Sequence, residues 1–263
     1  MNASVNALIL AGARDSGDPL CESENVKSKA VIDIAGSPML SYVTRALSGA
    51  GIKGPIWILG GEEEDLAKAT GHVDHRILPA KGAGPAASLA LALKGPVSTP
   101  LLVTTADHPL LTVHMLQNFL QQCDDGDADI CIGFAQRATI EAEYPSTKRT
   151  YLPIGEKDLS GCNLFFLRGE VAIGVLEFWS RVEKHRKQPW RIMRSLGLLF
   201  LLRVLLARAN TKKVFELLSR RLGAEIKPII LPFAEAAIDV DKLSDLQMVR
   251  EIFDRRKSHS STT

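Results

Sequence analysis

Aspartate side chains follow apolar runs at two places in this sequence, where carboxylates could hold a divalent cation. Asp107 follows the segment Leu101-Leu102-Val103-Thr104-Thr105-Ala106, which predicts a buried strand, so its carboxylate is expected at that strand's carboxyl end. Mg²⁺ prefers a few such oxygens together with substrate phosphates and water, although an aspartate here could also cap the following turn. A second carboxylate is needed, and Asp239 and Asp241 both offer one. We expect only one of this pair to face the metal.

A glycine loop near the N-terminus has the features of a polyphosphate site. The apolar run at residues 7–11 predicts a buried strand, which breaks at Gly12 into a loop that carries Arg14. A second cation, Lys29, follows a polar stretch. Backbone amides beside two cations suit phosphate groups, and an ordinary turn is the alternative. The glycine pattern of dinucleotide-binding folds and the Gly-Lys-Ser/Thr of P-loops are both absent.

Three further segments carry residues that could contact a substrate. Gly84 and Ser88 belong to a small-residue segment at a predicted helix start, where a flat ring could approach the backbone; close packing of that helix on the sheet is the alternative. Asn163 stands at a predicted strand start, where its amide could hold a hydroxyl or phosphate, or could form a turn. A cationic segment is read as a solvated helix end, as a lipid contact, or as an acceptor-phosphate clamp made of Arg186, Lys187 and Arg191.

These motifs resemble the MobA-like NTP-transferase family, the nucleotidyltransferases of the GT-A fold. The resemblance rests on segments spread along the chain: Leu10-Ala11-Gly12, Arg14, Lys29, Gly36-x-Pro38-Met39-Leu40, Gly84-Pro85-x-x-Ser88, Thr104-x-Ala106-Asp107-x-Pro109-Leu110, Gly161-x-Asn163-Leu164-Phe165 and Asp239-Val240-Asp241. The sequence departs from the common family pattern at three places, where Ala13 replaces a second glycine, Ser28 replaces a proline, and Lys242-Leu243 replaces threonine-proline.

The resemblance implies a role for each candidate. Catalysis would depend on Arg14, Lys29 and Asp107. The NTP would contact the loop and helix residues Ala11, Gly12, Ala13, Arg14, Lys29, Gly84 and Ser88 together with Asp107. Mg²⁺ would be held by Asp107 and Asp241, with Asp239 as the alternative ligand and helix capping as the alternative role of Asp241. Asn163 would belong to the acceptor half.

Hydrophobic periodicity predicts the elements that position these residues. Short apolar runs alternate with helical patterns in the first half, which favours right-handed crossovers and a mostly parallel sheet covered on both faces. Ser37 is expected to cap a helix whose first position is Pro38. The other expected elements are strands at 7–11, 55–59, 76–78, 101–104 and 129–133 and helices at 62–69, 86–93 and 113–123. Ligands bind beyond the carboxyl ends of such strands, so the loops after residues 11, 78 and 104 should meet at one crevice.

The second half is expected to be richer in helix. Strands at 151–153 and 163–167 are placed around a turn at Gly161, followed by helices at 171–184 and 189–222, a strand at 226–231 and a helix at 243–253. We therefore expect one α/β domain over residues 1–257, a Rossmann-like three-layer GT-A nucleotidyltransferase fold with a mostly parallel central sheet. A helical insertion would occupy about residues 171–222, and residues 258–263 would form a disordered tail.

Composition limits the classes of partner. The 263 residues carry a formal charge of +2, which argues against a dedicated nucleic-acid binder because such proteins have a strong basic excess. The four cysteines lack metal-type spacing and favour reduced thiols. We expect a cytoplasmic protein, since the N-terminus does not have a signal-type pattern. The apolar stretch from Leu196 to Ala207 falls short of the roughly 20 residues that span a bilayer, and it could form a homodimer interface or rest on a membrane.

The expected activity is Mg²⁺-dependent transfer of a nucleotidyl group from an NTP to a phosphorylated sugar, alcohol or cofactor precursor, with release of pyrophosphate. Charge neutralisation and positioning would supply most of the catalysis. One alternative is guanylyl transfer to the molybdenum cofactor precursor, and another is a non-catalytic nucleotide-binding regulator with the same fold. No Ser-His-Asp or Cys-His arrangement favours nucleophilic catalysis.

Overall fold

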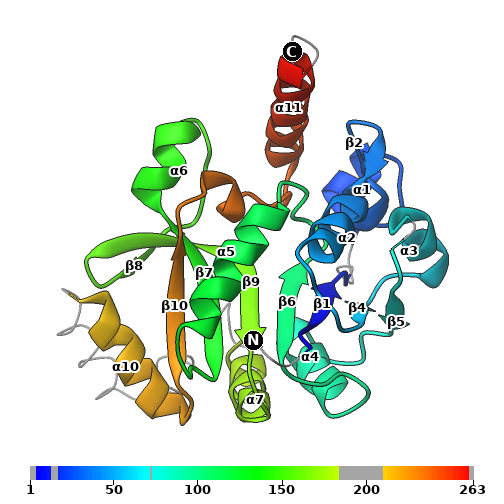
Figure 1. The fold of residues 1–263 in the computed structure, drawn as a ribbon. Coiled ribbons are helices and arrows are strands. Elements are labelled where there is room, and N and C mark those ends of the chain that lie inside the picture. The colour runs from blue at the N-terminus through cyan, green and yellow to red at the C-terminus, as the bar shows by residue number, and fades with distance from the viewer. Residues whose placement is uncertain (1–3, 13–16, 72, 184–209, 261–263) are drawn as a thin grey trace.

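In the computed structural model, which describes residues 4–12, 17–71, 73–183 and 210–260, the fold is built on one central sheet (Figure 1). Eight strands of the described chain form it, in the order β10-β7-β9-β6-β1-β4-β5, with β8 paired to β9. The strands are β1 (Asn6–Leu10), β4 (Ile56–Leu59), β5 (Arg76–Leu78), β6 (Leu101–Thr105), β7 (Ile130–Gln136), β8 (Leu152–Ile154), β9 (Lys157–Leu167) and β10 (Ile226–Leu231).

The sheet is mostly parallel, as the alternation of strand and helix predicts. β1 pairs in parallel with β4 and β6, β4 with β5, and β7 with β10. β9 runs antiparallel to both of its neighbours, β6 and β7. The chain leaves β1 toward β4 and β5 and then crosses back to β6 on the other side of β1. The strand order therefore reverses between β1 and β6, which is where ligands bind in sheets of this kind.

Helices cover both faces of the sheet and make the expected three layers. One face packs against α2 (Met39–Gly49), α3 (Glu63–Ala69) and α5 (Val113–Asp124), and the other against α4 (Pro85–Leu93), α7 (Val171–Glu183) and α10 (Thr211–Leu222). Successive side chains of a strand point to opposite faces, so Ala7 and Ile9 of β1 enter the first core while Leu8 enters the second. A strand buried on both faces reads as a continuous apolar run.

A third core joins the C-terminal helix to the segment after the glycine loop, at the carboxyl edge of the sheet. α11 (Leu243–Ser260) projects from this edge (Figure 1) and packs Leu246, Val249 and Ile252 into this core. The core also contains residues of α1 (Pro19–Ser23), of β2 (Asp33–Ile34) and of the 3₁₀ turn η2 (Ala234–Ala237). β2 forms a hairpin with β3 (Ser37–Pro38), and the 3₁₀ turn η1 (Lys29–Val31) contacts α2 and α3. The helix α6 (Arg137–Glu143) lies beside η2. The C-terminal helix α11 is thus held beside residues 20–34, which follow the glycine loop.

Three sequence expectations about element boundaries are wrong. Gly161 is not a turn but pairs with Phe134 inside β9; the turn before β9 contains Gly155, whose φ is +65°. The first half of β9 is rich in polar residues, so the sequence pattern does not indicate a strand there, although it pairs with both β7 and β8. Ser37 and Pro38 belong to β3, so α2 begins at Met39 and Ser37 does not cap it.

The C-terminal helix is also longer than expected. α11 continues through residues 258–260, which the sequence places in the disordered tail. The helical insertion expected at 171–222 corresponds to α7 and α10, and its central part lies outside the described residues. The apolar stretch from Leu196 to Ala207 is within that central part. No helix in the described ranges combines the length and apolar character needed to cross a membrane.

Candidate active site

The glycine loop begins where β1 meets the end of β4. The amide of Ala11 donates to the carbonyl of Leu59 at 2.9 Å, which holds Gly12 at the carboxyl edge of the sheet. Gly60 follows β4 with φ +93°, and a Cβ built on it would lie 2.9 Å from the Cα of Gly12. The two backbones therefore touch, and the loop start is fixed by this contact. Ala13 and Arg14, both predicted to contact the NTP, lie outside the described residues.

We expect Gly60→Ala to damage this loop. The new methyl group would collide with the Gly12 backbone, and alanine is strained at the positive φ of this position. The free energy of unfolding should fall by about 1–3 kcal/mol, and the KM for the NTP should rise. Denaturant titration and steady-state kinetics test this, with Gly71→Ala as the matched control because Gly71 also has a positive φ (+66°) but an open surrounding space. Equal effects of the two substitutions would contradict a specific role for the contact with Gly12.

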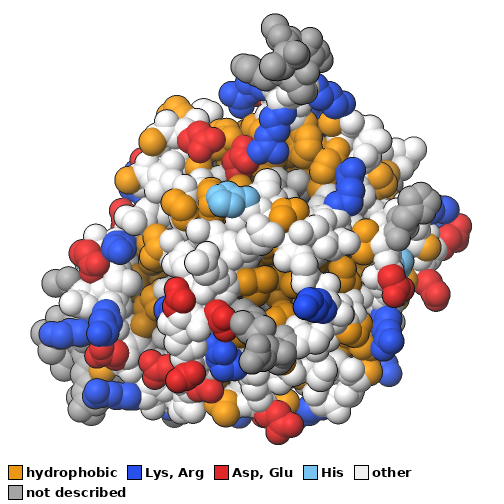
Figure 2. Space-filling model, in the orientation of Figure 1, with side chains coloured by type: hydrophobic (Ala, Val, Ile, Leu, Met, Phe, Trp, Pro, Cys, Tyr) orange, Lys and Arg blue, Asp and Glu red, His pale blue; other side chains and the backbone are white. Residues whose placement is uncertain are grey.

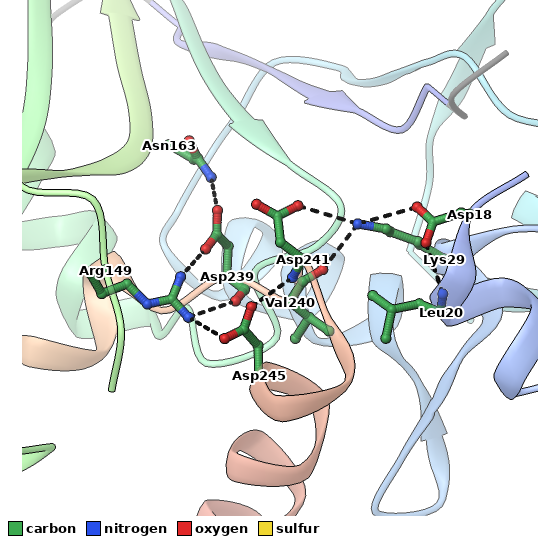
Figure 3. A network of polar contacts seen from close by, with 9 residues as sticks. All are labelled: Asp18, Leu20, Lys29, Arg149, Asn163, Asp239, Val240, Asp241 and Asp245. Carbon is green, nitrogen blue, oxygen red and sulfur yellow. Dashed lines mark hydrogen bonds and ion pairs between the residues drawn. The ribbon is translucent and has the colours of Figure 1, made fainter. Parts of the chain in front are cut away.

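Lys29 places its ammonium group at the mouth of this loop. Ser28 begins the 3₁₀ turn η1 by accepting the amide of Ala30 through its hydroxyl at 3.2 Å, so Lys29 leaves a backbone that is held in place. Its Nζ donates to the Val240 carbonyl at 3.2 Å and lies 3.3 Å from Asp241 Oδ1 and 3.5 Å from Asp18 Oδ2 (Figure 3). The ammonium group is thus held between the N-terminal loop and the segment that precedes α11.

Asp107 lies beyond the end of β6 and lines the same cavity as Lys29. The Ala106 amide donates to the Leu10 carbonyl at 3.0 Å, and the Asp107 carbonyl accepts the Val240 amide at 2.8 Å. The Oδ1 atom of Asp107 is completely buried and has no hydrogen-bond partner of normal geometry among the described residues. Burial is the largest cause that raises the pKa of Asp107 to about 6, although the neighbouring Thr105 side chain acts to lower the pKa of this carboxyl. A buried carboxylate oxygen without a partner is costly, and a cation would satisfy it.

The two candidate aspartates before α11 have different surroundings. Asp239 accepts hydrogen bonds from Asn163 Nδ2 at 3.0 Å and from the guanidinium group of Arg149 (Figure 3). Asp241 instead extends toward Lys29 and its side chain is 52% exposed. A cavity of about 220 Å³ is lined by both Asp107 and Asp241, together with Gly12 and Lys29. The loops after β1 and β6 thus meet at one cavity, which Lys29 and Asp241 also line, whereas Asp239 and the residues after β5 are not among those that line it.

This donor set fits a magnesium ion that keeps most of its coordination for substrate and water. Asp107 and Asp241 offer carboxylate oxygens to one cavity, and Oδ1 of Asp107 is the buried oxygen that a cation would satisfy. Within the described ranges, no group of three or more His, Cys, Asp or Glu side chains is arranged to hold a metal. Mg²⁺ is commonly bound through one or two carboxylates plus substrate phosphates, whereas a structural zinc site would require a closed protein shell.

The residues predicted to contact the nucleoside and the acceptor have the following surroundings in the fold. The Ser88 hydroxyl is buried and accepts the Gly82 amide at 3.0 Å, so it braces the loop in which Gly84 (φ +119°) precedes α4. Asn163 has φ +51° and binds Asp239. Their contacts with nucleoside and acceptor stay predictions. The three acceptor-phosphate candidates, which are Arg186, Lys187 and Arg191, lie outside the described residues.

Sequence reasoning missed three charged residues of this region. Asp18 caps α1 by accepting the Leu20 amide at 3.0 Å and also faces Lys29; an aspartate before Pro19 is a helix-start signal that could have identified it. Arg149 and Asp245 are nearly buried and form an ion pair of 3.0 Å. Arg149 lies in an irregular segment between α6 and β8, so no periodic pattern marks it.

The surface around this edge carries charges of both signs. On the face drawn in Figure 2, lysine and arginine side chains alternate with aspartate and glutamate side chains, and apolar side chains are scattered between them. The described residues on this face do not form a continuous basic stripe. The described part of this face therefore has no strong bias toward either sign of charge.

Comparison with known proteins identifies the family. The MobA-like NTP transferase domain matches residues 7–224. GlmU, a bifunctional protein of Rhizobium johnstonii, is 33% identical over 139 residues, which cover 51% of this chain and 30% of GlmU, so the match spans less than a third of that relative.

Solved structures agree. A hypothetical transferase from Thermus thermophilus is 30% identical with a TM-score of 0.77, covering 93% of this chain and all of that chain. The synthetase of CMP-2-keto-3-deoxy-manno-octonic acid, solved with CTP, shares the fold at 15% identity and a TM-score of 0.60, covering 97% and 100% of the two chains. The chain belongs to the MobA-like NTP transferase domain family, a family of nucleotidyltransferases with a GT-A-like fold.

Proposed function

We propose that the chain is a Mg²⁺-dependent nucleotidyltransferase that joins an NTP to a phosphorylated small-molecule acceptor and releases pyrophosphate. The single observation that carries this proposal is the buried, unpartnered Oδ1 of Asp107, a residue that lines one cavity with Lys29, Asp241 and Gly12 of the described chain. A metal site, a cation and a glycine loop are the parts that nucleotidyl transfer needs, because this reaction depends on positioning and charge neutralisation.

The roles follow from the positions of the groups. Asp107 and Asp241 would hold Mg²⁺, which when bound neutralises phosphate charge and orients the triphosphate. Lys29 Nζ, 3.3 Å from Asp241, would exchange part of its present contact for a phosphate oxygen. An oxygen of the acceptor phosphate forms a bond to the α-phosphorus as the bond to the bridging oxygen of pyrophosphate breaks. Lys29 stabilises the charge that develops on the phosphoryl oxygens, and no covalent intermediate with the chain is required.

A pyrophosphate-release assay tests the proposal directly. The four NTPs are each combined with Mg²⁺ and a panel of phosphorylated sugars, phosphorylated polyols and the molybdenum cofactor precursor. The nucleotide-linked product is identified by mass spectrometry, and nucleotide binding is followed in parallel by thermal shift. We expect turnover with one base and one class of acceptor, abolished by EDTA. Turnover only with GTP and the molybdenum cofactor precursor would favour the guanylyltransferase alternative. Nucleotide-induced thermal stabilisation without turnover across the panel would favour a regulator and contradict the proposal.

A further inference from the structure

Arg149 joins the segment before α11 to the rest of the domain. Its side chain is only 8% exposed, and its Nη2 donates to the Asp239 carbonyl at 3.2 Å and pairs with Asp245 Oδ1 at 3.0 Å (Figure 3). Nη1 also binds Asp239 Oδ1. One planar guanidinium group thus contacts two carboxylates and a backbone carbonyl at once, through two nitrogens whose spacing is set by the rigid fork of the arginine.

Arg149 is linked through Asp245 to Asp241, the residue that faces the proposed metal. Asp245 pairs with Arg149 through Oδ1, and its Oδ2 accepts the amide of Asp241 at 3.2 Å. The side chain of Asp245 is 6% exposed, so its orientation depends on these two contacts. The backbone of Asp241 is therefore fixed through Asp245, and its side chain is left to extend toward Lys29 and the cavity.

The guanidinium group of Arg149 also binds Asp239, the other aspartate that could serve as the second metal ligand. Asp239 and Asp241 flank Val240, whose amide donates to the Asp107 carbonyl at 2.8 Å, so the backbone of both aspartates passes beside Asp107. The two carboxylate oxygens of Asp239, however, are taken by Arg149 and Asn163. The distinction between the two aspartates is made by their hydrogen-bond partners.

We propose that Arg149 is a positioning residue that selects Asp241 over Asp239 as the second metal-facing carboxylate. This inference rests on the proposed function, because it assumes that a divalent cation binds at Asp107. Arg149 need not touch the nucleotide or the metal. It occupies Asp239 and, through Asp245, holds the Asp241 backbone so that the Asp241 carboxylate faces the cavity.

Arg149→Lys tests this with Mn²⁺ as the probe. The variant keeps the positive charge but replaces the planar fork, whose Nη1 and Nη2 bind Asp239 and Asp245 separately, by a single shorter-reaching ammonium group. Binding of Mn²⁺ alone is followed through the EPR signal of the free ion. We expect the Kd to rise at least about fivefold, and the Mg²⁺ concentration for half-maximal activity to rise similarly, while the KM for the NTP at saturating Mg²⁺ changes less than about twofold. Arg137→Lys is the matched control, since Arg137 is a half-exposed arginine paired with Glu141 on α6; it should leave all three values unchanged.

Further variants separate positioning from general damage. Arg149→Met leaves the nearly buried Asp245 and the partly buried Asp239 without this cation and is expected to lower Tm. The conclusion therefore depends on the lysine variant, whose folding is checked by circular dichroism. Adding Asp245→Asn to Arg149→Lys should weaken Mn²⁺ binding no further than the stronger single change, because both act along one path. A folded Arg149→Lys protein that binds Mn²⁺ as tightly as the wild type would overturn the inference. A wild-type protein that binds Mn²⁺ no better than Asp107→Asn would overturn the proposed function, and the inference with it.

Discussion

Asp107→Asn is expected to lower kcat by about 10²–10³-fold while leaving the metal-free protein at least as stable as the wild type at neutral pH. Asparagine fills the same space but supplies no negative charge for a divalent cation. Because the aspartate oxygen is buried without a partner in the described chain, its ionised form is costly in the metal-free protein, and the substitution removes that cost. Loss of activity with a gain in stability is the signature of a residue kept for function rather than for folding.

The pH dependence of stability follows from the direction of the pKa shift. Burial is the main cause that raises the pKa of the Asp107 carboxyl from 3.8 to about 6. The folded state therefore binds this proton more tightly than the unfolded state, and the resulting stabilisation is complete below pH 3.8 and is lost as the pH rises through about 6. The asparagine side chain of the variant does not titrate, so we expect the variant to gain stability relative to the wild type between those values. The gain is at most about 3 kcal/mol, since one pKa unit corresponds to about 1.4 kcal/mol.

Denaturant titrations in EDTA, at about pH 4 and at about pH 7.5, measure this difference on the two sides of the shifted pKa. Added Mg²⁺ with nucleotide should stabilise the wild type but not the Asp107→Asn variant. Asp158→Asn is the matched control, because Asp158 is a half-exposed aspartate near Arg137 and should alter neither kcat nor the pH profile. An unchanged kcat in Asp107→Asn would remove Asp107 from the metal site.

Lys29→Met is expected to lower kcat/KM for the NTP by about 10²-fold or more at saturating Mg²⁺. The methionine side chain has a similar length but leaves the triphosphate without this ammonium group. The effect should fall on both KM and kcat, since the ammonium group would contact the phosphates before and during transfer. Stability should also fall by about 1–3 kcal/mol, because Asp18, whose side chain is 11% exposed, loses the cation 3.5 Å away.

Steady-state kinetics with the best NTP from the substrate panel, and thermal unfolding, provide the two measurements. Lys68→Met is the matched control. Lys68 lies on the exposed side of α3 and pairs with Glu64 at 2.9 Å, and exposed helix pairs of this kind contribute little to stability. If the two lysine variants gave the same kinetics, the proposed phosphate contact of Lys29 would be wrong.

The sheet could be predicted because its strands have simple local signatures. The apolar runs at residues 7–10 of β1 and 101–103 of β6 are uninterrupted, since both faces of these strands are buried under helices. β9 was only half predicted, because its first half has no such run. That half contains Ser160 and Gly161, whose types favour turns, and pairing with β7 overrides that preference.

The residues of the candidate site also differ in how well the sequence alone identifies them. Asp107 could be identified because it follows a recognisable buried strand, and Lys29 because it belongs to the motif between the glycine loop and Gly36-x-Pro38. Arg149 could not, because it lies in an irregular segment and acquires its importance from two aspartates far along the chain, Asp239 and Asp245. Residue type alone gives no information about such long-range pairs.

The sequence by itself determined the layers of this protein and the residues that can carry charge to a phosphate, because periodicity and residue type are local properties. Only the tertiary structure decided which carboxylates line the same cavity, namely those of Asp107 and Asp241. The Val240 amide bonds to the Asp107 carbonyl, and this contact places the segment before α11 across the end of β6. Arg149 then occupies Asp239 and leaves Asp241 facing Lys29. The choice between two aspartates that are close neighbours in the sequence depends on hydrogen bonds from distant segments, and those exist only after the chain has folded.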